Sequence, residues 1–171
     1  MDVPYRQTMD SVEDEFMDSL RKKVSGLKEV YSSEQCQAML FFCPIVSRAG
    51  TDIDAAMKHL DQFPCLSVPI IMVILHSTFD PERIIPDSNN AIQRENTLAV
   101  DCLIFDNKLL RCQKNDNAIV QTAHLFKSKK VTSYYCLNYH GDRKLFIDQK
   151  ATKVSRCYEA GDERRSMCSF I

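Results

Sequence analysis

Two short, nearly continuous apolar runs dominate the hydrophobic pattern of the chain, at residues 38–46 (AMLFFCPIV) and 68–76 (VPIIMVILH). Apolar runs without polar alternation are typical of strands buried on both faces, as in a parallel sheet with helices above and below it. Between them, residues 51–63 repeat apolar positions at steps of three and four, which predicts a helix that Thr51 or Asp52 could cap. The pattern therefore predicts a strand–helix–strand unit.

A second periodic stretch precedes this unit. Residues 10–27 carry one apolar stripe, begin with the capping-box spacing of Asp10 and Glu13, and approach a stop at Gly26. Bases follow acids along the stretch, the order that the helix dipole favours. We expect an amphipathic helix that docks on the rest of the domain.

Downstream of the second apolar run, polar and apolar stretches alternate. Residues 80–96 are polar, contain two prolines and predict a long loop with a short helical turn. Residues 97–105 and 109–112 read as a hairpin turned by Asp106 and Asn107, because these residue types tolerate positive φ. A helix over 115–130, a strand over 133–139 and an edge strand over 144–147 follow; the inward candidates of that helix are Ile119, Val120, Ala123, His124 and Phe126.

Together these elements predict the α/β fold class: a single three-layer domain with a mostly parallel, Rossmann/flavodoxin-like sheet, a β-hairpin and an N-terminal amphipathic helix. We expect residues 1–30 to form the docking helix, 31–150 the α/β core and 151–171 a polar tail. A chain of 171 residues suits one such domain.

Composition narrows the function classes. The 22 basic and 23 acidic residues leave a formal net charge of −1, without the clustered basic footprint of a nucleic-acid binder, so we expect no nucleic acid partner. The longest apolar run, residues 68–75, is far shorter than the roughly 20 residues that span a bilayer, so we expect no transmembrane segment.

The cysteines bear on compartment and cofactors. Eight are present, and no pair has the C-x-x-C spacing of a structural zinc site. The N-terminus lacks the apolar core of a signal peptide. We therefore expect free thiols, no bound metal or cofactor, and a cytoplasmic location.

In open parallel sheets ligands bind beyond the carboxyl ends of the strands. The first such segment contains Ser47, Arg48, Gly50 and Thr51 and leads into a helix N-terminus, where backbone N–H groups and a guanidinium could bind phosphate or carboxylate. The plain alternative is an ordinary strand–helix connection in which Gly50 relieves strain and Thr51 caps the helix.

His76 ends the second apolar run and is the best-placed titratable group. With Ser77 and Asp80 it could form a hydrolytic site, but the G-x-S-x-G motif of a nucleophile elbow is absent. The alternative is a structural histidine.

The last four residues resemble a prenylation box that begins at Cys168. The alternative is an ordinary chain terminus, since a single lipid anchors a protein only weakly.

These observations favour a non-enzymatic, intracellular protein-interaction or signalling module with a protein partner. The alternative is an enzyme or an anion- or nucleotide-binding domain that uses loop 47–51 and His76.

Overall fold

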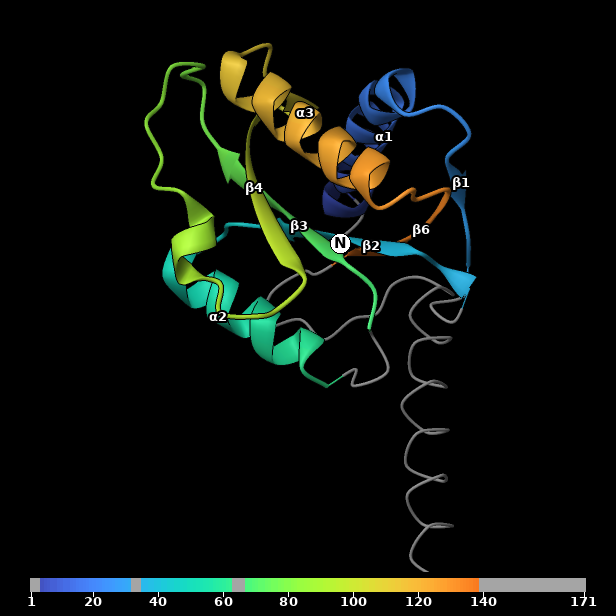
Figure 1. Ribbon diagram of the computed structural model, residues 1–171. Helices are drawn as coiled ribbons and strands as arrows, with labels where there is room; N and C mark the ends of the chain where they lie inside the picture. The colour runs from blue at the N-terminus through green and yellow to red at the C-terminus, as the bar shows by residue number, and fades with distance from the viewer. Residues whose placement is uncertain (1–3, 32–34, 63–66, 139–171) are drawn as a thin grey trace, which may run out of the picture.

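A computed structural model of the chain describes residues 4–31, 35–62 and 67–138 (Figure 1). Its fold is α/β, with a curled, mostly parallel six-stranded sheet in the order β1-β6-β2-β3-β4-β5. The strands are β1 (Lys28–Glu29), β2 (Ala38–Pro44), β3 (Ile70–Ser77), β4 (Thr97–Phe105), β5 (Lys108–Leu109) and β6 (Ser133–Asn138). The helices are α1 (Pro4–Lys23), α2 (Ala49–Leu60), α3 (Gln113–Ser128) and the short 3-10 helix η2 (Ser88–Ala91).

The predicted strand–helix–strand unit is confirmed. β2 and β3 pair in parallel from Met39 opposite Ile70 to Pro44 opposite Leu75, and α2 connects them. Every residue of β2 is buried, as are all residues of β3 except Ser77, because helices or loops cover both faces of these strands.

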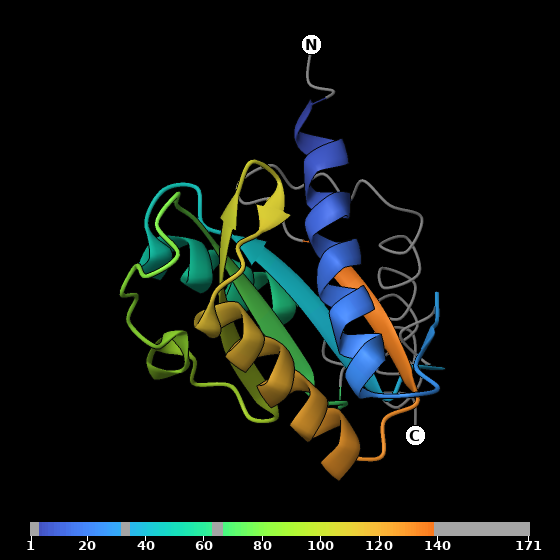
Figure 2. The ribbon, with the colours of Figure 1, turned by 90° about the horizontal axis from the view of Figure 1, so that it is seen from above.

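The two faces of the sheet have different covers (Figure 2). α1 and α3 lie over one face, where the core includes Ile71, Val73 and Leu75 of β3. α2 lies over the other face, where Met72 and Ile74 belong to a second core cluster. Alternate residues of this central strand thus pack on opposite faces of the sheet, as a strand that is buried on both faces requires.

α1 differs from the prediction at both ends. It begins at Pro4, so Asp10 lies inside the helix and the predicted capping box at Asp10 is wrong. The helix ends at Lys23, and Gly26 follows with φ 78°, a conformation that a residue without Cβ adopts at little cost. Phe16 and Leu20 are fully buried, so the apolar stripe docks on the sheet as predicted.

α3 confirms three of its five inward candidates. Ile119, Ala123 and Phe126 are buried, whereas Val120 and His124 are exposed. A residue lies about 100° around a helix from its neighbour, so a position next to the buried stripe faces solvent.

The β4–β5 hairpin turns at Asp106 and Asn107, with φ values of 48° and 61°, as predicted. Its second strand has two residues rather than the four predicted, because the Asn115 side chain bonds the backbone of Leu103 and Leu110 where the ladder would continue. The predicted edge strand at 144–147 and the tail at 151–171 lie outside the described residues.

Candidate functional site

The connection from β2 to α2 contains four predicted site residues, all of them exposed. Ser47 precedes the helix, Arg48 is its N-cap residue, and Gly50 and Thr51 lie in its first turn. Because the helix begins at Ala49, Thr51 and Asp52 lie inside its first turn, and the prediction that one of them is the N-cap residue is wrong. The Arg48 side chain makes no capping hydrogen bond.

Gly50 has an ordinary position in that turn. Its φ is not in the left-handed region, and beyond its own helix turn and chain neighbours no heavy atom lies within 4 Å of where a Cβ would stand. The expectation that Gly50 relieves strain is therefore wrong, since an alanine would fit.

The Asp52 carboxylate closes this connection. It accepts hydrogen bonds of 2.8 Å from the backbone N–H of Val46, the backbone N–H of Ser47 and the Ser47 hydroxyl. Burial alone would raise the pKa of Asp52, but these three bonds outweigh it and lower that pKa below its usual value. The amides before α2 thus already hold an anion that the protein supplies itself. Nearby, burial first and the Asp52 charge second raise the pKa of the Cys43 thiol to about 12.

His76 lies in a separate polar cluster on the α2 side of the sheet. Its Nε2 is 2.8 Å from Asp101 Oδ1 on the neighbouring strand β4. The Ser88 hydroxyl of η2 donates to the same oxygen at 2.5 Å, and the Ser88 backbone N–H donates to Oδ2 at 3.0 Å. One carboxylate therefore ties together β3, β4 and the long loop.

The environment of Asp101 favours its charged form. Burial by itself raises the pKa of this carboxyl, but the bonds from His76 and Ser88, together with the His76 charge, lower it below its usual value. Asp101 is the acceptor for every one of these contacts.

This order of groups differs from that of a serine hydrolase. A nucleophilic hydroxyl must donate its hydrogen bond to the histidine that will take its proton, whereas the Ser88 hydroxyl donates its hydrogen bond to Asp101. The other proposed partner of His76, the Asp80 carboxylate, accepts instead from the Glu82 backbone N–H. Within the described residues, no hydrogen bond or ion pair joins His76 to residues 47–52, although β2 and β3 are neighbours.

Two asparagine side chains cover two positions on the outer edge of β4. Asn89 accepts from the Ala99 N–H at 2.8 Å and donates to the Ala99 carbonyl at 2.7 Å. Asn115 accepts from the Leu103 N–H at 2.7 Å and donates to the Leu103 carbonyl at 2.8 Å. A carboxamide thus replaces a neighbouring strand at two positions.

Sequence reasoning missed Asp101, Ser88, Asn89 and Asn115. Asp101 did leave a signal, since it is the one charged residue in the apolar strand TLAVDCLIF, and a charge in such a run needs partners. The other three stand in polar segments, where nothing distinguishes them from solvent-facing residues.

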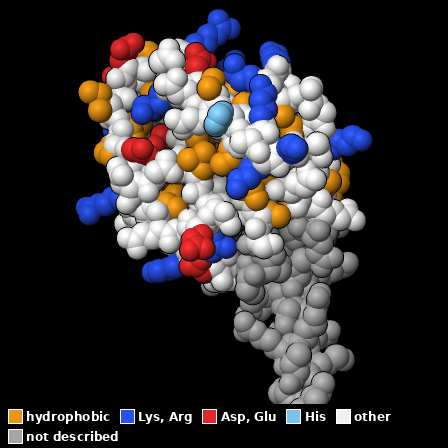
Figure 3. Space-filling model, viewed as in Figure 1, with side chains coloured by type: hydrophobic (Ala, Val, Ile, Leu, Met, Phe, Trp, Pro, Cys, Tyr) orange, Lys and Arg blue, Asp and Glu red, His pale blue; other side chains and the backbone are white. Residues whose placement is uncertain are grey.

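The carboxyl ends of β2, β3 and β4 carry exposed apolar side chains. Val46 is 71% exposed, Phe79 is 81% exposed and Phe105 is 53% exposed. Ile84, in the loop after β3, is also exposed. Figure 3 shows apolar side chains at the margin of the face over this loop. We call Val46, Phe79 and Phe105 the carboxyl-end apolar cluster.

Two depressions lie elsewhere on the described surface. A groove of about 670 Å³ runs between α1, β5 and α3, with Glu15, Lys22 and Asp116 among its lining residues. A cavity of about 360 Å³ lies beside the outer edge of β4.

The remaining chemistry-bearing residues form no second centre in the described segments. Five cysteines there are thiols rather than disulfides, and no group of three His, Cys, Asp or Glu side chains in those segments is arranged to hold a metal. No helix in the described part of the chain is long and apolar enough to span a membrane. Cys168 lies outside the described residues.

Comparison with models of known families, with curated proteins and with solved structures finds no match for this chain.

Proposed function

We propose that this protein is a non-enzymatic interaction module that binds a protein partner through the carboxyl ends of β2, β3 and β4. The observation that carries the proposal is the carboxyl-end apolar cluster, in which three neighbouring strands each end near a large exposed apolar side chain. Single exposed apolar residues are common on monomers, but a group of them at one end of a sheet favours an interface.

The pairing of the strands brings this cluster together. Pro44 lies opposite Leu75 and Ser77 lies opposite Ile104, so the three strands end at nearly the same level. Neighbouring strands are about 4.8 Å apart, so the ends of β2 and β4 are separated by about 10 Å.

Charged residues surround the cluster. Lys108 is exposed and pairs with Phe105 across the β4–β5 hairpin. Arg48, also exposed, is two residues after Val46, and Asp80 follows Phe79. An apolar centre with a polar rim is the usual layout of protein interfaces.

The alternative is an enzyme or an anion- or nucleotide-binding domain that uses loop 47–51 and His76. The geometry supports it less well, because Asp52 already binds the loop amides and Asp101 already binds the His76 ring. An incoming anion would have to displace one carboxylate and would meet its charge.

At the level of fold, we propose a doubly wound arrangement of the Rossmann/flavodoxin-like type. The chain adds β3 and β4 on one side of β2 and later adds β6 on the other side, and α2 and α3 cover opposite faces. Such a reversal of direction defines the switch point of doubly wound sheets.

The module's place in the cell is part of the proposal. The described thiols are in keeping with a reducing cytoplasm. A prenyl group on Cys168 would bring the module to a membrane, and the intact mass of the protein from a eukaryotic host tests that modification.

Affinity capture with the full chain tests the interface. We expect wild-type protein to retain a reproducible set of proteins that the double variant Phe79→Ser, Phe105→Ser loses at least about tenfold, as truncation of central interface residues does. Val120→Ser is the matched control, because Val120 is a 50% exposed apolar residue on the outer face of α3. Identical capture by the double variant and the wild type would contradict the proposal, provided that both unfold at the same denaturant concentration.

A further inference from the structure

The outer edge of β4 has a gap between its two asparagines. Hydrogen bonds from β3 reach the carbonyls of even-numbered residues in and next to β4. The Ile70 N–H donates to the carbonyl of Asn96, immediately before β4, and the Thr78 N–H, just after β3, donates to the carbonyl of Ile104. Odd-numbered residues of β4 therefore direct their backbone groups away from β3, because these groups alternate in direction along a strand.

Three such positions follow one another along the edge: Ala99, Asp101 and Leu103. Asn89 covers the first and Asn115 covers the third, each with the same pair of hydrogen bonds. The backbone N–H and carbonyl of Asp101 stand between them and have no partner among the described residues. Each occupied position is about 6.7 Å away, two residues along the strand.

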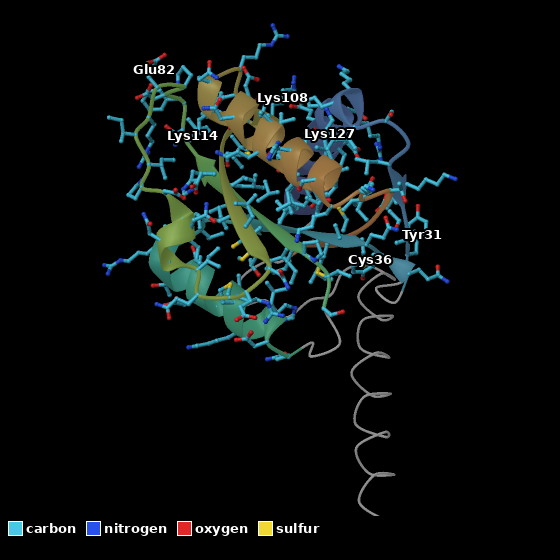
Figure 4. The ribbon with its side chains drawn as sticks, in the orientation of Figure 1. Tyr31, Cys36, Glu82, Lys108, Lys114 and Lys127 are labelled. Atoms are coloured by element: carbon cyan, nitrogen blue, oxygen red, sulfur yellow. The ribbon has the colours of Figure 1, made fainter. Side chains whose placement is uncertain are left out.

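The cavity of about 360 Å³ lies at this gap. Its walls come from β4 around Asp101, from the loop at Asp87 and Asn89, and from α3 at Lys114 and Gln121. Small-molecule sites begin at about 300 Å³. Figure 4 shows Lys114 at the end of α3 beside the loop that carries Glu82. Lys114 as a residue is half-buried, and its side chain has no ion-pair or hydrogen-bond partner within the described segments.

We propose that this cavity binds a small molecule that carries a lactam or primary carboxamide together with a negatively charged group. The amide pairs with the Asp101 N–H and carbonyl in the way that Asn89 and Asn115 pair with their own positions, and Lys114 binds the anion. A longer strand cannot add here, because the two asparagines occupy the adjacent edge positions. The site selects for one amide group.

Titration of uniformly ¹⁵N-labelled full chain with three probes tests the proposal. The probes are uracil, which has the lactam; orotate, which is uracil with a carboxylate; and 1,3-dimethyluracil, which lacks every N–H donor. We expect uracil and orotate to shift the Asp101 amide resonance saturably at millimolar concentration, and we expect 1,3-dimethyluracil to leave it in place. The Ala99 and Leu103 amides serve as internal references, because their partners are already in place.

Lys114→Glu tests the charged part of the site. An exposed or half-buried ion pair is worth less than about 1 kcal/mol, so we expect orotate to bind about threefold to fivefold more tightly than uracil in the wild type. Lys114→Glu should abolish this preference. Lys127→Glu should keep it, because Lys127 lies at the other end of the same helix (Figure 4).

Three results would overturn the proposal. One is an Asp101 amide that does not move, and another is an equal response to 1,3-dimethyluracil. The third is slow hydrogen exchange of the Asp101 amide in the free protein that becomes fast in Gln121→Ala, since the protein would then fill the gap itself. An orotate preference that survives in Lys114→Glu would remove Lys114 from the site.

Discussion

The outer edge of β4 and the carboxyl ends of β2, β3 and β4 are neighbouring surfaces of one sheet. They differ in how far other side chains cover them. At the edge, buried or half-buried polar side chains cover the backbone, and two asparagines take the place of a further strand. At the carboxyl ends, Val46, Phe79 and Phe105 are left in solvent. An unprotected strand edge invites unselective pairing with other chains, and the two asparagines block such pairing at Ala99 and Leu103. Under the proposed function, the strand ends are then the surface that a protein partner binds.

The largest expected effect is at the closed edge. Asn115→Ala should lower the free energy of unfolding by about 3 kcal/mol, because Asn115 is 3% exposed and its loss leaves backbone groups of Leu103 and Leu110 without side-chain partners. Urea unfolding followed by circular dichroism measures the change. Asn117→Ala, at an exposed site on the same helix, is the control and should change stability by less than about 0.5 kcal/mol. A decrease in the free energy of unfolding below about 1 kcal/mol in Asn115→Ala would mean that the stability of the edge does not depend on the Asn115 hydrogen bonds.

Asn89→Ala should have the next effect, about 1 to 2 kcal/mol, because Asn89 is only half-buried and water can reach the freed groups of Ala99. Hydrogen exchange of the Ala99 amide should accelerate in the same variant. Asn90→Ala, at the exposed next position, provides the comparison and should leave that exchange rate unchanged.

Asp101→Asn should lower stability by about 1 to 2 kcal/mol at pH 7, since a neutral amide is a weaker acceptor for His76 and Ser88. The pKa of Asp101 is lowered on folding, so its contribution is present above the unfolded pKa near 4 and is lost as the pH falls through the folded pKa. The difference in stability between wild type and variant should therefore shrink as the pH is lowered below about 4. A difference that stays constant as the pH is lowered would show that the charge of Asp101 has no part in folding.

The smallest expected effect is at the open end. Phe79→Ser should change the free energy of unfolding by less than about 0.5 kcal/mol, because Phe79 is 81% exposed. Phe105→Ser should lower it by about 1 kcal/mol, because Phe105 is 53% exposed and the rest of its surface is buried. Thermal unfolding of the isolated protein gives this value. A loss above about 1.5 kcal/mol in either variant would mean that the ring is packed within the domain and is not available to a partner.

The central part of the fold could be predicted from sequence because it depends on local pattern. Strands that are buried on both faces must be apolar throughout, which marks residues 38–44 and 70–76, and the hairpin turn needs residues such as Asp106 and Asn107 that accept positive φ. The N-terminus of α1 was misplaced because Asp10 and Glu13 have the same spacing in a helix interior as in a capping box.

The polar clusters could not be predicted because they join distant parts of the chain. Ser88 and His76 meet only through Asp101, 13 and 25 residues away. The two-residue strand β1 is too short for any periodic signal. The exposure of Phe79 and Phe105 could not be predicted from the sequence either. An aromatic residue at the end of an apolar strand has the same sequence context whether it is packed or in solvent.

Site-specific photo-crosslinking in living cells tests the interaction surface most directly. A photoreactive phenylalanine analogue replaces Phe79 in one variant of the full chain and Phe105 in a second. In the control variant it replaces Val120. We expect positions 79 and 105 to give discrete crosslinked species that contain the same partner protein. Position 120 should give none of these species. Crosslinks of equal pattern from all three positions, or none from positions 79 and 105 when the analogue is incorporated in folded protein, would contradict an interface at the carboxyl ends of the strands.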